Sequence, residues 1–296
     1  QMKNVKVILW GLGAMGGGIG KMLAKKKGVD IVGGIDIGGK IGKNLYDVVP
    51  GIQQGDRPDV IVGTPEDVIV PGAADVVVVC TNSFTKDVYD KLVFVMEKGM
   101  NVITSAEEMA YPQAQEPELA KKLDECAKKN GVSVMGTGIN PGLIMDLLVI
   151  LWTAACEEVN HITSRRVNSL SPFGPAVMEE QGIGISVDEF NARKADGTMA
   201  GHVGFAESVG MMCEALGWKL DEFGQDMEPI VTDVDRKSPY GFAPAGSVAG
   251  VAMKGWGIVD GERKLDMDHP QQIEPEQVGV DTGDYVILDA VPPVNM

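Results

Sequence analysis

Short apolar runs alternate with helix-like segments along the first 140 residues. The run Asp75–Thr81 is apolar enough to be buried on both faces, and the helix-like segments each end at a glycine. Such alternation predicts a parallel, doubly wound sheet whose two faces are covered by helices. The predicted strands are Val5–Trp10, Asp30–Asp36, Asp75–Thr81, Asn101–Thr104 and Val132–Met135, separated by predicted helices Met15–Lys27, Thr85–Lys98 and Glu116–Asn130.

The pattern changes after Gly136, where the Gly/Pro-rich turn GTGINPG indicates a boundary between residues 1–140 and 141–296. Beyond it, strand-like stretches of mixed polarity predict an α+β domain with a half-exposed antiparallel sheet. The expected helices are Leu143–Cys156, Val187–Arg193 and Val203–Leu216, and the expected strands are Val159–Leu170, Ile230–Val234, Ser247–Ala252, Trp256–Val259 and Tyr285–Ala290.

A glycine-rich turn follows the first predicted strand directly. It reads Gly11, Leu12, Gly13, Ala14, Met15, Gly16, and Asp36 ends the next strand 20 residues later. A GxGxxG between strand and helix, followed by an acidic residue, is typical of a Rossmann dinucleotide site. Gly11 would make the turn, Gly13 would admit a pyrophosphate, and Gly16 would bring helix and strand together. The alternative is a glycine-rich turn without a ligand.

The neighbourhood of Asp36 bears on the choice of cofactor. Its carboxylate would accept a hydrogen bond from the ribose 2′-OH and repel a 2′-phosphate, which favours NAD. Lys40 or Lys43 could reach such a phosphate, so NADP is expected to be tolerated. Thr81, Asn82 and Ser83 end the third strand, where the nicotinamide half is expected, although Asn82 and Ser83 could instead cap the following helix.

Two carboxylates, Glu107 and Glu108, follow the fourth strand at the same sheet edge. A proton-transfer step needs such a group. The motif Ser105-x-x-Glu108 also fits a capping box, which would occupy Glu108 and leave Glu107 as the catalytic candidate.

Charge is unevenly divided between the two halves. The whole chain carries −16, and residues 141–296 hold 25 Asp+Glu against 10 Lys+Arg. An acidic chain repels phosphate backbones, so nucleic acid is not an expected partner, whereas a small cationic amine is. Alternatively, the acidic residues form only a solvated surface that aids solubility. Four substrate-contact candidates lie in or beside this half: Asn140, Arg165, Phe173 and His202.

Other function classes find little support. The longest apolar stretches are too short or interrupted to cross a bilayer, and no secretory signal is expected, which leaves the cytoplasm as the predicted compartment. The four cysteines are far apart and the three histidines are scattered, so neither a disulfide framework nor a metal site is expected.

Taken together, WGLGAMG, TSAEEMAYP, TGINPG and GHVGFAESVGM resemble the 2,4-diaminopentanoate dehydrogenase family, including related native amine dehydrogenases. The resemblance implies a Rossmann domain followed by a substrate-binding and dimerisation domain similar to that of dihydrodipicolinate reductase, in a homodimer. It implies oxidative deamination of 2,4-diaminopentanoate to 2-amino-4-oxopentanoate and ammonia in ornithine fermentation. It places the catalytic glutamate at Glu107 or Glu108, without choosing between them.

Three alternatives stay open. Dihydrodipicolinate reductase itself has a similar plan, but it relies on adjacent histidines, and no His-His occurs here. Homoserine or another amino-acid dehydrogenase is a second alternative. A dinucleotide-sensing protein without chemistry is the third. The homodimer is predicted to form through apolar side chains on the half-exposed strands of the second domain.

Overall fold

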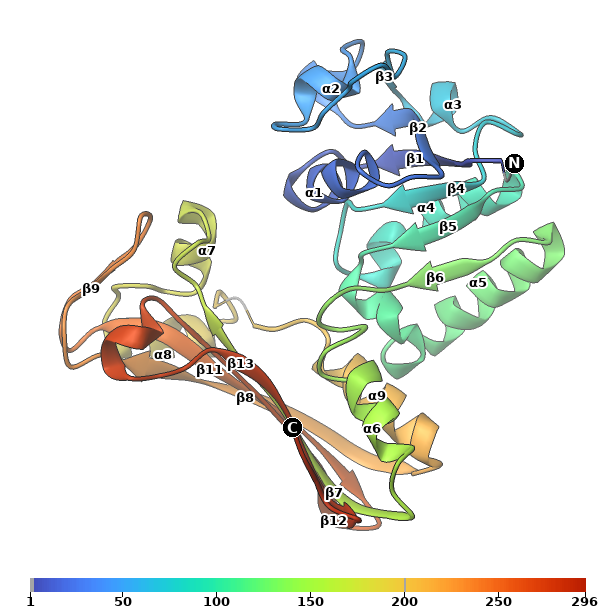
Figure 1. Cartoon of the computed structure of the whole chain (residues 1–296). Coiled ribbons are helices and arrows are strands. Elements are labelled where there is room, and N and C mark those ends of the chain that lie inside the picture. The colour runs from blue at the N-terminus through green and yellow to red at the C-terminus, as the bar shows by residue number, and fades with distance from the viewer. Residues whose placement is uncertain (1–2, 200) are drawn as a thin grey trace. The chain divides into compact units, whose positions relative to one another are not determined.

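The computed structural model describes residues 3–199 and 201–296, which divide into two compact units, one ending at residue 139 and the other beginning at residue 140 (Figure 1). Each unit has its own sheet of six strands. The units are described separately below.

The first unit is built on a fully parallel sheet, as the sequence predicts. Its strand order, β3-β2-β1-β4-β5-β6, reverses direction next to β1, so that β1 and β4 flank the point where a ligand crevice forms in such sheets. The strands are β1 (Val5–Trp10), β2 (Val29–Ile35), β3 (Val62–Gly63), β4 (Val76–Val79), β5 (Asn101–Thr104) and β6 (Val134–Gly136).

Alternate side chains of β1 enter two different cores. Val7 and Leu9 pack in one core with residues from helices α1 (Ala14–Leu23) and α2 (Leu45–Val48). Ile8 and Trp10 pack in another core with residues from α4 (Thr85–Glu97) and α5 (Pro117–Asn130). Both faces of the sheet are therefore covered, which explains why its strands are almost wholly apolar.

Helix α1 stops four residues short of the prediction. It ends at Leu23, and the N–H groups of Lys25 and Lys26 donate to carbonyls only three residues back. Such tightening closes the last turn, and Gly28 then adopts φ +79°, which ends the segment. The basic residues of this stretch form an exposed turn rather than a helical face.

The second unit carries a mixed sheet of order β14-β13-β7-β12-β11-β8. Only the β7–β12 pairing is parallel, whereas the sequence predicts an antiparallel sheet. The strands are β7 (Glu158–Ser169), β8 (Leu220–Val231), β11 (Val248–Val259), β12 (Glu262–Gln272), β13 (Gly283–Val291) and β14 (Val294–Asn295). The two strands predicted within 247–259 are one long strand, β11. The prediction omits β12 altogether.

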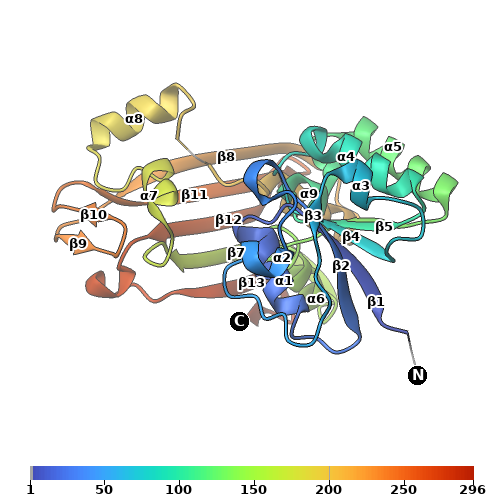
Figure 2. The ribbon, with the colours of Figure 1, turned by 90° about the horizontal axis from the view of Figure 1, so that it is seen from above.

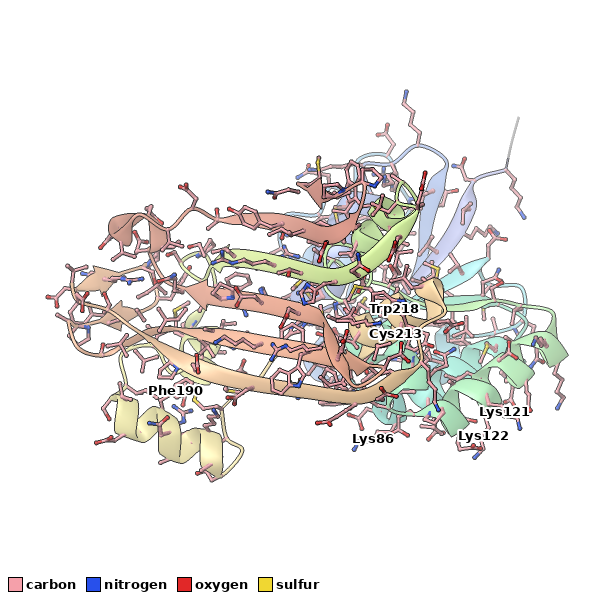
Figure 3. All side chains as sticks on the ribbon, turned by 90° about the horizontal axis from the view of Figure 1, so that it is seen from below. Lys86, Lys121, Lys122, Phe190, Cys213 and Trp218 are labelled. Carbon is pink, nitrogen blue, oxygen red and sulfur yellow. The ribbon has the colours of Figure 1, made fainter. Side chains whose placement is uncertain are left out.

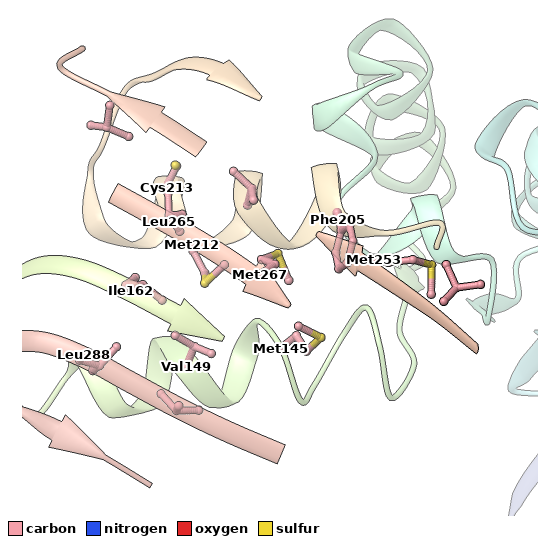
Figure 4. Close-up of a cluster of buried hydrophobic side chains, with 14 of the residues drawn as sticks. Met145, Val149, Ile162, Phe205, Met212, Cys213, Met253, Leu265, Met267 and Leu288 are labelled. Atoms are coloured by element: carbon pink, nitrogen blue, oxygen red, sulfur yellow. The ribbon is translucent and has the colours of Figure 1, made fainter. Parts of the chain in front are cut away.

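Two helices, α6 (Leu147–Thr153) and α9 (Phe205–Leu216), contribute to the core on one face of this sheet (Figure 4). Val149 of α6 and Met212 of α9 pack in the same cluster as Leu265 and Met267 of β12. A further helix, α8 (Val187–Ala195), lies beside the edge strand β8 and buries Phe190 completely (Figures 2 and 3). These side chains anchor the segments that carry the candidate site residues of the unit.

The opposite face of the sheet is charged. Arg165 pairs with Asp268, and Lys254 pairs with Glu228. Arg263 pairs with Asp266 and lies over the ring of Trp256. The expectation of exposed apolar strands is wrong for Ser247–Ala252, because Val248, Ala249 and Val251 are fully buried. We call the face of the sheet that carries these ion pairs, opposite the core, the charged face.

Candidate active site

The glycine-rich turn connects β1 to α1 with little space around two of its glycines. Gly11 has φ +94°, and a Cβ there would lie 2.5 Å from the Cys80 carbonyl oxygen. A Cβ on Gly16 would lie 1.8 Å from the Gly11 oxygen, whereas one on Gly13 would meet nothing within 4 Å. Gly13 is also the N-cap of α1 and has no side-chain cap. The helix therefore presents free N–H groups beside open space, which suits a phosphate.

Asp36 is held in place by three donors. Its carboxylate accepts hydrogen bonds from the N–H of Leu12 at 2.8 Å, from the N–H of Ile37 at 2.7 Å and from Lys40 Nζ at 2.7 Å. Partial burial pushes the pKa of Asp36 upward, but the hydrogen bonds from Lys40, Ile37 and Leu12 outweigh it and leave the pKa below its ordinary value. Asp36 is thus an ionised acceptor with a cation already beside it.

A pocket of about 420 Å³ opens beside these residues. The sequence-predicted Gly11, Leu12, Gly13, Asp36, Lys40, Thr81 and Asn82 line it, together with Trp10, Ile37, Cys80 and Lys91. A second pocket, of about 380 Å³, shares Leu12, Gly13 and Lys40 with the first and continues along Ala14, Gly17, Gly18 and Lys21. The fold thus gathers most of the predicted cofactor residues around one groove. Met15 lies beside the groove, with an exposed side chain, and Ser83 lies one residue beyond Asn82.

Lys91 is a pocket residue that the sequence interpretation missed. It lies on α4 and donates to Asn82 Oδ1 at 2.7 Å and to the Asp87 carbonyl at 3.1 Å, and partial burial lowers its pKa. The side chain of Asn82 is therefore held by Lys91. The alternative capping role for Asn82 and Ser83 is not what the structure shows, because the α4 N-cap is Phe84, which offers no side-chain cap.

The two glutamates after β5 have different surroundings. The Glu108 side chain turns inward: the residue is 7% exposed, and its Oε2 accepts from the N–H of Thr85 at 2.7 Å, while its own N–H donates to the Ser83 carbonyl at 3.1 Å. Glu107 is half-buried, and within residues 3–199 and 201–296 its carboxylate has no hydrogen-bond or ion-pair partner. The predicted capping box is wrong in detail, because Ala106 precedes this short helical turn and Glu108 caps α4 instead.

In the second unit, the pleat of β7 separates two adjacent arginines. Arg165 lies on the charged face, with its guanidinium 3.0 Å from Asp268 and over the ring of Tyr285. Arg166 has the opposite parity, that of buried Ser164, and its side chain is 18% exposed. Its carbonyl accepts from His269 Nδ1 at 2.9 Å. Arg165 is the substrate-contact candidate predicted from the sequence, but Arg166 is the arginine whose side chain lies on the same side as the buried polar groups.

His202 and His269 form an imidazole pair, with ring centroids 5.2 Å apart. Burial, followed by repulsion from His269 and Arg166, lowers the pKa of His202 to about 3. Burial likewise lowers the pKa of His269. His202 Nε2 is buried without a hydrogen-bond partner among the described residues. Both rings are therefore uncharged at neutral pH and have hydrogen-bonding capacity for a ligand.

The remaining two candidates lie differently. Asn140 donates to Met145 Sδ at 3.3 Å, while its buried Oδ1 has no partner in the described part of the chain. The next residue, Pro141, touches Gly204, where a Cβ would lie 2.5 Å from Pro141 Cδ, so the Asn140 and His202 segments pack together. Phe173 is 45% exposed in the loop after β7 and has no ring contact with these residues.

Residues 3–199 and 201–296 lack two further classes of feature. No group of three or more His, Cys, Asp or Glu side chains there is arranged to hold a metal ion. Among the same residues, no helix has the length and apolar character needed to cross a membrane.

Comparison with known proteins decides the family. The family model described as "2,4-diaminopentanoate dehydrogenase C-terminal domain" matches residues 143–296. A curated 2,4-diaminopentanoate dehydrogenase from Acetoanaerobium sticklandii is 68% identical over all 296 residues, which span 84% of that protein. The chain belongs to the 2,4-diaminopentanoate dehydrogenase family. The resemblance noted in the sequence is thereby confirmed, and so is the enzyme class, an oxidoreductase of amines that uses a nicotinamide cofactor.

Solved structures of lower sequence identity confirm the fold. An amine dehydrogenase from Mycobacterium smegmatis superposes with a TM-score of 0.78 at 23% identity, over 99% of this chain and 86% of that one. A putative myo-inositol dehydrogenase from Sinorhizobium meliloti gives 0.58 at 13% identity, over 99% and 75%. This chain thus shares a Rossmann unit and a sheet-bearing second unit with these two oxidoreductases.

Proposed function

We propose that this protein oxidises the 4-amino group of 2,4-diaminopentanoate, giving 2-amino-4-oxopentanoate and ammonia with reduction of NAD or NADP. The observation that carries the proposal is the 68% identity over the full chain to the relative of that name. Glu107 supports it, because its carboxylate has no partner among the described residues and its neighbour Glu108 donates to the Ser83 carbonyl, one residue beyond Asn82 of the dinucleotide groove. A substrate with two ammonium groups and one carboxylate also suits the acidic second half.

The residues around the glycine-rich turn fit a dinucleotide. The open space at Gly13 and the free N–H groups of α1 would hold the pyrophosphate, and Asp36 would accept from the adenosine ribose. When bound, the nicotinamide accepts the hydride from the substrate carbon.

Glu107 would carry the proton transfers. Hydride can leave the carbon only once its ammonium has lost a proton, and an ionised carboxylate accepts that proton. Glu107 passes that proton to solvent and then takes a proton from the water that attacks the resulting iminium. Transfer of this second proton to the nitrogen releases ammonia, and loss of the hydroxyl proton leaves the ketone. Glu108 is less suited to this duty because its Oε2 is already bound by the Thr85 N–H.

Cofactor choice follows from the Asp36–Lys40 pair. The carboxylate favours NAD, whereas Lys40, 2.7 Å away, offers a cation to the 2′-phosphate of NADP. We therefore infer that NAD is preferred and NADP is tolerated.

The carboxylate of the substrate is assigned to the second unit. Arg166 supplies the cation, and the uncharged ring of His202 supplies a donor at Nε2, with Asn140 nearby in the same unit. His269 does not donate to the carboxylate, because its single proton lies on Nδ1, which donates to the Arg166 carbonyl. Arg166 replaces Arg165 in this role because Arg165 lies on the charged face, whereas Arg166, although it is also paired with Asp284 at 3.4 Å, lies on the other side of the sheet, next to His269.

The biological setting belongs to the same proposal. A homodimer would bury the charged face, where the Arg263–Asp266 pair and Trp256 offer polar and aromatic contacts. We also propose that the enzyme acts in the cytoplasm, in ornithine fermentation. Light scattering that gives one chain mass at micromolar concentration would reject the dimer.

A spectrophotometric scan of NADH formation over a panel of diamino acids and monoamines tests the activity. We expect 2,4-diaminopentanoate to give the highest kcat/KM. Turnover of another amine without turnover of 2,4-diaminopentanoate would reject the substrate.

A further inference from the structure

Glu108 connects two segments of the first unit that are 23 residues apart in sequence. Its N–H donates to the Ser83 carbonyl at 3.1 Å, and its Oε2 accepts from the Thr85 N–H at 2.7 Å. Glu108 therefore contacts the β4–α4 connection at two points, in the loop and at the first residue of the helix. Because both bonds come from one residue, they fix the position and the orientation of the segment after β5 relative to that loop.

The carboxylate is well suited to the start of α4. The helix is 13 residues long, and its N-cap, Phe84, has no side chain that can accept a hydrogen bond. A negative charge at a helix N-terminus is stabilised by the free N–H groups and the helix dipole. With only 7% of its surface exposed, Glu108 is also shielded from the solvent that would weaken this contact.

Each connected segment carries a part of the proposed chemistry. The β4–α4 loop includes Thr81 and Asn82, which line the dinucleotide groove. The segment after β5 includes Glu107, whose backbone is joined directly to Glu108. Movement at Glu108 therefore changes the distance between the cofactor loop and the proposed base.

From these contacts we infer that Glu108 is a positioning residue for the reaction: it holds the acid–base group Glu107 at a fixed place relative to the cofactor loop. The inference rests on the proposed function, since it requires Glu107 to exchange the proton. A misplacement of the order of 1 Å at a reacting group can cost about 100-fold in rate.

Thr85 offers a way to remove the same bond from its other end. It is the first residue of α4, where proline is favoured, and Phe84 before it is extended (φ −104°, ψ 141°), as a residue preceding proline prefers. Thr85→Pro therefore deletes the N–H that Glu108 accepts while leaving a sound helix start. Thr85→Val is the matched control, because it keeps the N–H and removes only a hydroxyl that has no partner among the described residues.

The experiment measures kcat across pH, the NADH dissociation constant and Tm for Glu108→Ala, Glu108→Gln, Thr85→Pro, Thr85→Val and the double variant Glu108→Ala/Thr85→Pro. We expect Glu108→Ala and Thr85→Pro each to lower kcat by roughly 10- to 100-fold. The double variant should be no slower than the slower single variant, because both substitutions remove the same bond from the Thr85 N–H to the Glu108 carboxylate. Glu108→Gln keeps an acceptor oxygen and should lose less than about 10-fold, while Thr85→Val should stay within about 2-fold. The pH dependence of kcat should keep the wild-type shape throughout.

Two results would overturn the inference. If Glu108→Ala and Thr85→Pro lower Tm and leave kcat unchanged, the contact is only a structural cap. If Glu108→Gln abolishes the pH dependence, Glu108 is itself the acid–base group. Should Glu108→Ala fail to fold, Thr85→Pro and Glu108→Gln make the same comparison. Failure of the proposed function is distinguishable, because Glu107→Gln would then retain full turnover whatever the Glu108 variants do.

Discussion

The candidate site residues of each unit include a pair of identical neighbours, and in each pair the two side chains have different environments. In the first unit, Glu108 turns inward to cap α4, while Glu107 has no bonding partner among the described residues. In the second unit, the pleat of β7 places Arg165 on the charged face and Arg166 on the other side. Neighbours that are equivalent in composition are therefore separated by a helix cap in one unit and by strand geometry in the other.

The difference between the units lies in the range of the contacts that separate each pair. Glu108 is distinguished by a bond to Thr85, at the start of the adjoining helix. Arg166 is distinguished by pairing with strands from the end of the chain, through His269 of β12 and Asp284 of β13. The local capping motif predicted that Glu108 is the occupied member of the first pair but assigned it to the wrong helix, whereas the second pair required the sheet order.

The largest expected effect is at Glu107. Replacing Glu107 with Gln preserves size and hydrogen bonding but removes the group that accepts the proton, so kcat should fall by roughly 10²–10⁴-fold. NADH binding, measured by fluorescence titration, should change little. If kcat falls by only a few-fold, the catalytic carboxylate lies elsewhere.

Arg166 should show the next largest effect. Arg166→Met removes a charge-assisted contact to the substrate carboxylate worth about 1.5–3 kcal/mol, so KM for 2,4-diaminopentanoate should rise by about 10- to 100-fold. Arg165→Met is the matched control, and it should leave KM within about 3-fold because Arg165 lies on the charged face. If the two substitutions raise KM equally in steady-state kinetics, Arg165 and Arg166 do not differ in substrate binding.

His202 provides a test of stability in the second unit. Its folded pKa of about 3 lies below the ordinary 6.5, so the unfolded chain binds a proton that the folded chain does not as pH falls from about 6.5 to 3. Over that window His202 lowers the free energy of unfolding by up to about 1.4 kcal/mol per pH unit. Urea unfolding at pH 7 and pH 5 should therefore show a smaller acid loss in His202→Gln than in wild type. An identical loss in both proteins would mean that His202 is not held neutral by burial.

The smallest effect concerns cofactor preference. Asp36→Ser removes the repulsion of the 2′-phosphate while Lys40 remains, so the ratio of kcat/KM for NADP over NAD should rise by about 10-fold. Lys40→Met should move the ratio the other way. A ratio that stays constant in Asp36→Ser would show that Asp36 does not contact the ribose.

Local signals account for what the sequence could predict. The glycine-rich turn, Asp36 and the parallel sheet follow from patterns within about 30 residues, and the fold agrees with them. Lys91 was missed because only the packing of α4 turns it toward Asn82. The His202–His269 pair joins residues 67 positions apart and carries no sequence signal. By contrast, β12 does have a sequence signal that was missed, because Leu265 and Met267 alternate with charged residues, as in a half-buried strand.

The pH dependence of single-turnover hydride transfer, followed as NADH absorbance with 2,4-diaminopentanoate, tests the division of roles between neighbours most directly. Wild type and Glu108→Gln should share a limb on which the rate falls as pH decreases and the base becomes protonated, and Glu107→Gln should lack that limb. A limb that persists in Glu107→Gln and disappears in Glu108→Gln would contradict the account.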